Sequence, residues 1–185
     1  MRKCLVTGGC GFIGSNLVHR LVKEGWVVDV VDNLSNGYLE NLEGLKIRVL
    51  PNASFLPGYE EVEKEKRGDG EVLVISDDFS HPGVLKRIAN VKYDVVFHQA
   101  AIPRVLYSVE NPSITTDVNI SGTIRLMESC RSNVDRLVFA SSSSVYGGAE
   151  IMPTQESERG KNLPKSPYAW QKFTIEDYAR MAYDL

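Results

Sequence analysis

The sequence has few cysteines, little net charge and no long apolar run. The three cysteines are an odd number without metal-ligand spacing, which argues against both a disulfide framework and a zinc site: Cys4, Cys10 and Cys130. The three histidines are scattered and form no metal-binding motif. We therefore expect no bound metal, and we interpret Cys10 as a small residue that fits its turn rather than as a reactive thiol.

The net charge of −3 gives no electrostatic reason to expect a nucleic acid or an anionic membrane as a partner. The first residues, Met1 to Val6, carry charge, and the apolar run there is too short for a signal peptide; no later stretch has the length of a membrane span. We therefore expect a cytoplasmic protein whose ligands are held by local features of the chain.

The sequence does contain a regular alternation of strand-like and helix-period segments. Its 185 residues, 43% of them hydrophobic, suffice for one sizeable core, so we expect one domain over residues 1–185. The alternation predicts an α/β fold, a Rossmann-type doubly wound parallel sheet with helices on both faces. A charged stretch at 51–70 interrupts the alternation and is interpreted as an insert.

The expected strands are Lys3–Thr7, Trp26–Val31, Leu45–Leu50, Glu71–Ser76, Tyr93–Ala101 and Val134–Ala140. The expected helices are one that follows Gly11, then Pro82–Asn90, Pro112–Ser132 and a last helix from about Ser166 to the end. Between the last strand and the last helix, and over Pro103–Asn111, we expect loops.

A glycine-rich turn joins the first strand to the first helix. Gly8, Gly11 and Gly14 are spaced i, i+3, i+6: the first supplies a backbone angle that other residues resist, the second admits a pyrophosphate, and the third lets helix and strand pack closely. A pyrophosphate would lie at the helix N-terminus, where N–H groups lack partners. Phe12 and Ile13 begin an apolar stripe that predicts a helix buried on one face. A turn that binds no ligand is the alternative.

Asp32 follows the second predicted strand, on the order of 20 residues beyond the glycine turn, where a carboxylate accepts hydrogen bonds from the adenosine ribose. The same carboxylate would repel a 2′-phosphate, so we expect NAD rather than NADP as the cofactor. Alternatively, Asp32 only caps the following loop.

Asp78 and Phe79 follow the fourth predicted strand, where an acid and an apolar ring suit an adenine, the acid at its exocyclic amine and the ring at its face. Alternatively, Asp78 or Ser80 only caps the helix that begins at Pro82. Ala100 and Ala101 end the fifth strand and are small enough for a cofactor to lie against the backbone.

Tyr168 and Lys172 are one helical turn apart and share a face of the last helix. A phenol, with a pKa of about 10, must lose roughly 3 units to act as a base near pH 7. The ammonium of Lys172, together with the positive charge of an oxidised nicotinamide, would lower it. A hydroxyl from the Ser141–Ser144 run would orient phenol and substrate. We interpret His98, at a strand end, as a satisfied histidine rather than a catalyst.

The motifs TGGCGFIG, DNLSNG, FHQAA, VNISGT, SSSSVYG and SPYAWQK, in this order, resemble the extended short-chain dehydrogenase/reductase superfamily, especially its 4-epimerases of UDP-sugars. The resemblance covers nearly the whole chain except 51–70. Members of this family are longer, and their remaining part holds the nucleotide of the substrate. The resemblance therefore implies that this chain is an N-terminal portion that lacks the C-terminal substrate domain, and that its last helix contributes to a homodimer.

The resemblance also implies the role of each site residue. The pyrophosphate ligands are Gly8, Gly11, Phe12, Ile13 and Gly14. The ribose ligands are Asp32 and Asn33, the adenine pair is Asp78 and Phe79, with Asp77 as the acid if the register slips, and the cofactor is lined by Ala100 and Ala101. The catalytic residues are Ser142, Tyr168 and Lys172, of which Tyr168 and Lys172 also contact the nicotinamide ribose. The substrate residues are Arg104, Tyr107, Ser142 and Ser143.

Ser143 and Ser144 occupy positions where dehydratases of this superfamily carry an acid pair and decarboxylases usually a glutamate. The resemblance therefore implies inversion at C4 of a UDP-sugar through a transient 4-keto intermediate. The alternatives are another enzyme of the superfamily, namely a dehydratase, decarboxylase or reductase, and a non-catalytic NAD-binding fragment. We expect this chain by itself to bind NAD weakly and to turn over UDP-sugar poorly or not at all.

Overall fold

The computed structural model describes residues 1–51, 67–148 and 151–184, so most of the expected insert at 51–70 lies outside the described residues. The chain forms two compact units, one built from Met1–Ala100 and Arg125–Phe139 and the other from Ala101–Ile124 and Ala140–Leu185. Within the described ranges, no helix has the length and apolar character that crossing a bilayer requires.

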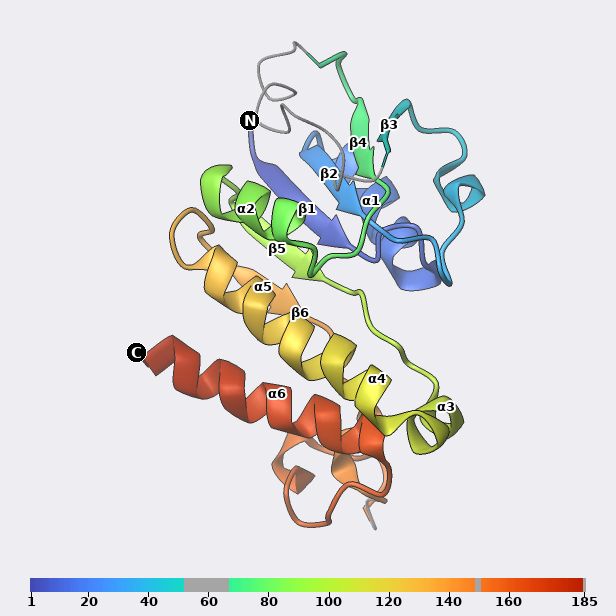
Figure 1. Cartoon of the computed structure of the whole chain (residues 1–185), viewed down its shortest axis with the longest axis vertical. Helices are drawn as coiled ribbons and strands as arrows, with labels where there is room; N and C mark the ends of the chain where they lie inside the picture. Colours follow the sequence, from blue (N-terminus) through green and yellow to red (C-terminus); the bar gives the residue numbers. More distant parts are fainter. Residues whose placement is uncertain (52–66, 149–150, 185) are drawn as a thin grey trace. The chain divides into compact units, whose positions relative to one another are not determined.

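The first unit contains a six-stranded, all-parallel sheet in the order β3-β4-β2-β1-β5-β6. Its strands are β1 (Lys3–Thr7), β2 (Val27–Val31), β3 (Ile47–Leu50), β4 (Val72–Ile75), β5 (Val95–His98) and β6 (Leu137–Phe139). The chain moves outward from β1 through β2 and then returns to β5 on the other side of β1, which makes the sheet doubly wound (Figure 1). The predicted fold class is confirmed.

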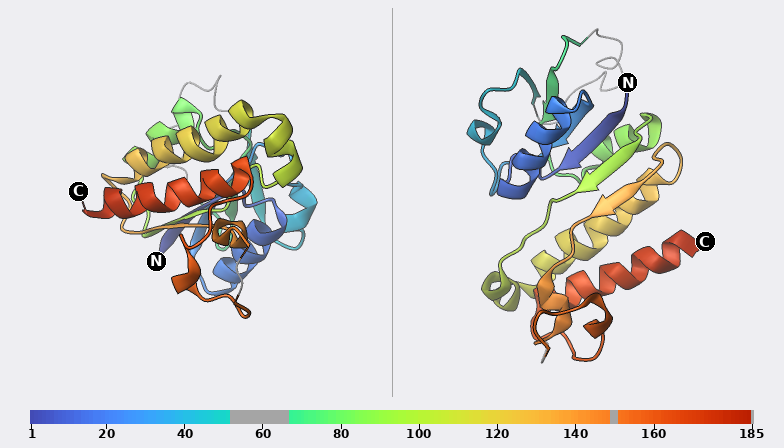
Figure 2. Two further views of the ribbon diagram at one scale, coloured as in Figure 1. Left: turned by 90° about the horizontal axis from the view of Figure 1, so that it is seen from below. Right: turned by 180° about the vertical axis from the view of Figure 1, so that it is seen from behind.

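The helices of the first unit cover both faces of this sheet. They are α1 (Phe12–Lys23), α2 (Pro82–Asn90) and α5 (Thr123–Cys130), the last of which enters this unit at Arg125. The views from front and back show α1 and α2 on opposite faces (Figures 1 and 2), as right-handed crossovers that leave β1 in opposite directions require. A 3₁₀ turn, η1 (Leu39–Leu42), lies between β2 and β3.

One charged side chain lies inside this apolar sheet. Asp29, in β2, is fully buried and accepts hydrogen bonds from Tyr93 Oη at 2.6 Å and Arg87 Nη2 at 3.0 Å, and it pairs with Arg67 at 2.5 Å. Burial opposes ionisation, but the guanidinium groups and the ammonium of Lys3 outweigh it and hold the pKa of Asp29 below its usual range. Removing one partner would leave a charge buried without compensation, so this cluster fixes β2 against its neighbours.

The second unit is helical. Its α-helices are α3 (Val105–Glu110), α4 (Pro112–Thr116), the start of α5, and α6 (Pro167–Asp184). A π-helical segment, η4 (Asp117–Gly122), called the π-turn below, lies between α4 and α5. The 3₁₀ turns are η5 (Ser143–Tyr146) and η6 (Glu156–Glu158). The loop expected at Pro103–Asn111 is wrong over α3. The helix expected at about Pro112–Ser132 is present from Pro112 to Cys130, with the π-turn between its α-helical segments α4 and α5.

Arg159, in the segment before α6, binds that segment to the helix. The Arg159 guanidinium lies 3.8 Å from the ring centroid of Phe173 and donates to Asp177 Oδ1 at 2.8 Å and to the Glu176 carboxylate. Glu176 also accepts a hydrogen bond from the Ser141 hydroxyl. The start of the serine run and the 3₁₀ turn η6 are therefore both held to one turn of α6.

Candidate functional site

The glycine turn of the first unit is built as its spacing predicts. Gly8 has a φ of +69°, and a Cβ there would lie 2.7 Å from the backbone nitrogen of Ala100. A Cβ on Gly14 would lie 2.1 Å from the carbonyl oxygen of Gly8. Gly11 precedes the first residue of α1, and no side chain caps it. Gly8 and Gly14 must therefore be glycine even in the chain alone, because a side chain would collide with the backbone. Gly11, in contrast, leaves the N-terminus of α1 open.

The helix N-terminus at this turn favours an anion. Its first N–H groups lack intrahelical partners, and its first turn contains no acidic side chain that would compete with a ligand. Phe12 and Ile13 are 85% and 66% exposed, so the expectation that they belong to the buried stripe of α1 is wrong. They lie in the first turn, beyond the part of the helix that packs on the sheet. Their backbone, rather than their side chains, is suited to a pyrophosphate.

Asp32 lies just beyond the end of β2 and is almost completely buried. Its Oδ2 accepts from the backbone N–H of Cys10 at 2.9 Å, and its Oδ1 accepts from that of Leu34 at 2.9 Å. The carboxylate therefore caps the following loop and also joins it to the glycine turn. Since each oxygen has a second acceptor site, Asp32 can still accept from ribose hydroxyls. The neighbouring Asn33 is exposed, and its Oδ1 accepts from Ser35 N at 3.1 Å.

The acid expected at the adenine is partly engaged within its own turn. Asp78 Oδ1 accepts from Ser80 N at 2.8 Å and from Ser80 Oγ at 2.7 Å. The cap of α2 is His81, whose Nδ1 accepts from Gly83 N at 3.2 Å, so the alternative that Asp78 or Ser80 caps this helix is wrong. Asp77 is buried, and its Oδ1 accepts from Asp78 N at 2.8 Å.

The end of β5 meets the glycine turn through buried groups. His98 is a satisfied histidine, as expected: its Nδ1 is hydrogen-bonded to Thr7 Oγ1 at 2.7 Å. Phe79 is 5% exposed, with its ring centroid 4.8 Å from that of His98, so little of the ring that was expected to contact adenine is exposed in the chain alone. Ala100 donates its N–H to Thr7 Oγ1 at 3.3 Å, and both Ala100 and Ala101 are half-buried.

The second unit brings together the three residues expected to be catalytic. The hydroxyl of Ser142 lies close enough to the phenol of Tyr168 to lower the pKa of that phenol. Lys172, one turn further along α6, donates from Nζ to the carbonyl oxygen of Ala140 at 2.8 Å. Ser142 Oγ in turn accepts from Ser144 N at 3.2 Å, which fixes the 3₁₀ turn η5 that follows. A buried phenol, a half-buried hydroxyl and a buried ammonium are the groups that a proton transfer requires.

Burial dominates the electrostatics of this group in the chain alone. Burial raises the pKa of Tyr168, and the hydrogen bond with Ser142 only partly offsets the rise. Burial also lowers the pKa of Lys172 to about 8. The chain alone therefore does not lower the phenol pKa, and the prediction that Lys172 lowers it together with an oxidised nicotinamide stays a prediction. A further positive charge is needed to bring the phenol to neutral pH.

Burial of Lys172 predicts a pH-dependent stability. Because its folded pKa lies below the ordinary value of 10.5, the unfolded chain binds this proton more tightly. The buried ammonium therefore destabilises the folded chain; this destabilisation is fully present below about pH 8 and disappears as the pH rises to 10.5. Relative to Lys172→Met, the free energy of unfolding of the native chain should rise by about 3 kcal/mol across this window, as followed by urea denaturation. Parallel pH profiles of the two proteins would show that the ammonium is not desolvated.

The residues expected to contact the substrate lie at the surface of the second unit. Arg104 precedes α3 and is exposed, Tyr107 lies within α3 and is 36% exposed, and Ser143 is the exposed first residue of η5. Ser143 is adjacent to Ser142 in the chain.

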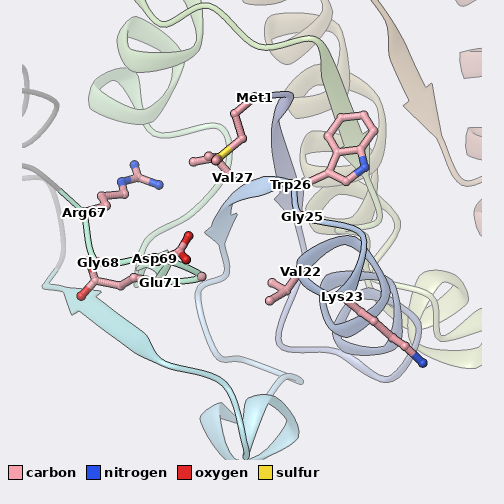
Figure 3. Close-up of a pocket in the computed structure, with 11 residues that line it drawn as sticks. Met1, Val22, Lys23, Gly25, Trp26, Val27, Arg67, Gly68, Asp69 and Glu71 are labelled. Carbon is pink, nitrogen blue, oxygen red and sulfur yellow. The ribbon is translucent and has the colours of Figure 1, made fainter.

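A pocket of about 520 Å³ lies elsewhere (Figure 3). It is lined by residues at the amino ends of β1, β2 and β4 and at the end of α1: Met1, Val22, Lys23, Gly25, Trp26, Val27, Arg67, Gly68, Asp69, Gly70 and Glu71. In parallel α/β sheets the ligand crevice lies at the carboxyl ends of the strands. This pocket is therefore not the expected cofactor site. Within residues 1–51, 67–148 and 151–184, no cluster of histidine, cysteine or acidic side chains is suited to a metal.

Burial makes the cysteines unreactive. It raises the pKa of the Cys10 thiol to about 12 and those of Cys4 and Cys130 to about the same value. At neutral pH these thiols are protonated and poor nucleophiles. The interpretation of Cys10 as a small packing residue is confirmed.

Sequence reasoning missed the polar side chains that hold α6 in place. Ser108 Oγ accepts from the backbone N–H of Tyr168 at 3.1 Å. Gln171 is fully buried and hydrogen-bonded to Asn119 at 2.8 Å. Single hydroxyl and amide side chains on helices give no periodic signal. The one available hint was a glutamine directly before Lys172.

Comparisons with known proteins agree with this arrangement. Residues 4–184 match the model of the NAD dependent epimerase/dehydratase family. The chain is 34% identical over 179 residues to a putative UDP-glucose 4-epimerase of Methanocaldococcus jannaschii, covering 96% of this chain and 50% of that protein. It is 37% identical over 188 residues to the UDP-glucose 4-epimerase of Mycolicibacterium smegmatis, covering 99% and 53%.

Solved structures give the same result. The UDP-N-acetylglucosamine 4-epimerase of Methanobrevibacter ruminantium, in complex with UDP-N-acetylmuramic acid, matches with a TM-score of 0.77 and 34% identity, covering 99% of this chain and 51% of that one. The UDP-glucose 4-epimerase of Thermus thermophilus, in complex with NAD, matches with a TM-score of 0.74 and 33% identity, covering 97% and 50%. The chain thus spans about half the length of the relatives it matches. The match over nearly all its residues confirms the resemblance stated above: this chain belongs to the NAD dependent epimerase/dehydratase family.

Proposed function

We propose that this chain is the NAD-binding part of an enzyme that inverts C4 of a UDP-sugar. The observation that carries the proposal is the Tyr168 phenol beside the Ser142 hydroxyl, with Lys172 one turn away, in a chain that also contains a glycine turn at an open helix N-terminus. Several relatives are named as UDP-glucose or UDP-N-acetylglucosamine 4-epimerases, which supports inversion rather than dehydration or decarboxylation.

The residues of the first unit fit a dinucleotide. We assign the pyrophosphate to the turn formed by Gly8, Gly11 and Gly14 and to the first N–H groups of α1. We assign the adenosine ribose to Asp32 and Asn33, and the adenine to Asp78 and the edge of Phe79. The Asp32 carboxylate would repel a 2′-phosphate, so NAD is the proposed cofactor. When bound, NAD supplies a hydride acceptor and a positive charge.

The residues of the second unit handle the proton. In the proposed mechanism Tyr168 accepts the proton of the sugar 4′-hydroxyl as the C4 hydrogen leaves as hydride. Ser142 donates a hydrogen bond that favours the phenolate and orients the sugar oxygen, and Lys172 contacts the nicotinamide ribose. The 4-keto sugar then turns over, hydride returns to its other face, and Tyr168 returns the proton. Protons and electrons balance within the cycle, so no cofactor is consumed.

Substrate contacts are proposed for Arg104 and Ser143, with Ala101 lining the cofactor. Arg104 and Ser143 are exposed side chains of the second unit. Ser143 and Ser144 provide no carboxylate beside Ser142, and this favours inversion over water elimination.

The test measures binding and turnover separately. The 185-residue chain is titrated with NAD and with NADP by calorimetry, and the complete gene product is assayed against UDP-glucose and UDP-N-acetylglucosamine, with sugar products resolved by NMR. We expect NAD to bind more tightly than NADP and the C4 epimer to accumulate without net change in nicotinamide absorbance. Net reduction of NAD, or a 4-keto-6-deoxy or decarboxylated product, would identify another enzyme of the superfamily. NAD binding without any product would favour a binding module.

We also propose a homodimer and a cytoplasmic location. The homodimer is supported by large apolar side chains exposed on α6: Trp170, Met181 and Tyr183. A location in a reducing compartment is consistent with three free, buried cysteines. Sedimentation of the complete gene product and fractionation of the source cells test the two proposals.

A further inference from the structure

Gln171 is a buried polar side chain that the proposed mechanism does not use. It is fully buried within α6, directly before Lys172 and three residues after Tyr168. Its Nε2 donates to Thr115 Oγ1 at 2.9 Å and to Thr116 Oγ1 at 3.1 Å, and its Oε1 accepts from Asn119 Nδ2 at 2.8 Å. Both amide protons are therefore bonded to one helix segment, and the carbonyl to the π-turn that follows it.

Asn119 passes this connection to the backbone of Ile102. Its Oδ1 accepts from the N–H of Ile102 at 2.9 Å, and its Nδ2 donates to the carbonyl oxygen of Ile102 at 3.1 Å. Ile102 lies between Ala101 and Arg104, which are assigned to cofactor and substrate. The network thus joins α4, the π-turn, the segment around Ile102 and α6, all in the second unit.

The network specifies one position of α6. Both amide groups use all their N–H donors, so the buried network is satisfied. If α6 rotated by 100°, the angle between successive residues, or slid by one turn, several of these groups would be buried without partners, at a cost of about 1–3 kcal/mol each. Apolar packing alone penalises such shifts less, because apolar contacts are not directional. Tyr168 has a second anchor, the bond from its N–H to Ser108 Oγ.

We propose that Gln171 is a positioning residue: through Thr115, Thr116 and Asn119 it sets the rotation and height of α6, so that the Tyr168 phenol stays on Ser142 and the Lys172 ammonium stays on Ala140. The proposal rests on the proposed function, because the value of this alignment is the proton transfer by Tyr168. Gln171 acts through the helix and the π-turn rather than on the substrate.

The activity test uses Gln171→Met in the complete gene product, because methionine keeps the length of the side chain and removes its hydrogen bonds. We expect kcat to fall by about 10- to 100-fold, since a displacement of about 1 Å at a reacting group costs this much, while the KM for UDP-sugar and the Kd for NAD change by less than about threefold. Thr116→Val, which removes one of the two threonine acceptors, should give a smaller loss of the same kind.

The control is Ile175→Ala, which removes a fully buried side chain one turn further along α6 and outside the network. It should lower the thermal midpoint by at least as much as Gln171→Met, since such truncations cost about 2–5 kcal/mol, but leave the pH dependence of kcat unchanged. In Gln171→Met the limb of the pH profile that reports the phenol should move to higher pH, because the bond with Ser142 that favours the phenolate is lost. Equal profiles in the two variants would reduce Gln171 to a packing residue.

A measurement on the 185-residue chain separates failure of this proposal from failure of the proposed function. The signal of Tyr168 Cζ, the ring carbon that carries the hydroxyl, is followed by NMR in the chain labelled at its tyrosines. Tyr168→Phe assigns this signal. Gln171→Met should raise the titration midpoint of Tyr168 and Ile175→Ala should not, whether or not the protein is an epimerase. A Tyr168 titration that is identical in native chain and Gln171→Met overturns the proposal.

Discussion

Replacing Tyr168 with phenylalanine should lower kcat for epimerisation by a factor of about 10² to 10⁴, the range that a positioned acid or base contributes. The physical reason is that no other group in the Ser142 cluster can take the proton. Ser142 already accepts from the N–H and the hydroxyl of Ser144, and the Lys172 ammonium is committed to the Ala140 carbonyl. The measurement is the rate of UDP-sugar inversion by the complete gene product, with products resolved by NMR.

The affinity for NAD provides the internal control. The main-chain bond from Tyr168 N–H to Ser108 Oγ does not involve the phenol, so the variant should fold with the same thermal midpoint to within a few degrees. The Kd for NAD should change little. A kcat within tenfold of the native value would exclude Tyr168 as the base. If Tyr168→Phe does not fold, Ser142→Ala is measured in its place, because it keeps the phenol but removes the hydroxyl that favours the phenolate.

The sheet was predictable because its signal is local. β1 has the predicted bounds Lys3–Thr7, and α2 has the predicted bounds Pro82–Asn90 because a proline fixes its first turn. Apolar runs that end in small or polar residues determine the remaining strands, and the direction of each crossover follows from its hand. The buried carboxylate of Asp29 was not predictable, since its partners Arg67, Arg87 and Tyr93 are distant in sequence.

The errors occur where tertiary contacts decide. α3 was expected as a loop, and its helix is held by Ser108, whose hydroxyl is bonded to the first turn of α6. The π-turn arises where Asn119 turns inward to Ile102 and Gln171, contacts that no periodicity indicates. Phe12 is apolar but exposed, because it lies in the first turn of α1.

The candidate site, too, was predictable only in part. Motif order and the i, i+4 spacing located Ser142, Tyr168 and Lys172 in sequence, and the structure places the Ser142 hydroxyl beside the phenol. The rise that burial gives the pKa of Tyr168 in the chain alone was not predictable, because burial is a property of the folded unit. The side chains that align the catalytic residues were missed, since each is an ordinary serine, threonine, asparagine or glutamine until the fold places it.

Gly14→Ala should remove NAD binding and destabilise the chain at the same time. A Cβ at this position would lie 2.1 Å from the carbonyl oxygen of Gly8 and 2.8 Å from its carbonyl carbon, and both are backbone atoms. Gly8 cannot yield easily, because its φ is +69° and the space toward Ala100 is filled. The helix and the strand must therefore separate, at about 1–3 kcal/mol of unfolding free energy or more.

Two other glycines show which part of this effect belongs to the ligand. Gly25→Ala imposes a similar left-handed backbone, with φ of +77°, but meets no atom within 4 Å, so it should cost about 1–2 kcal/mol and leave the Kd for NAD unchanged. Gly11→Ala brings a Cβ to 3.3 Å from the Gly8 carbonyl oxygen, where a shift of a few tenths of an ångström relieves the contact, so it should destabilise the chain much less than Gly14→Ala. If the pyrophosphate lies against Gly11, the same methyl group should weaken NAD at least about tenfold, or 1.4 kcal/mol by calorimetry. Equal NAD affinity in native chain and Gly11→Ala, with stability preserved, would move the pyrophosphate away from this turn, and Gly14→Ala would then act through the fold alone.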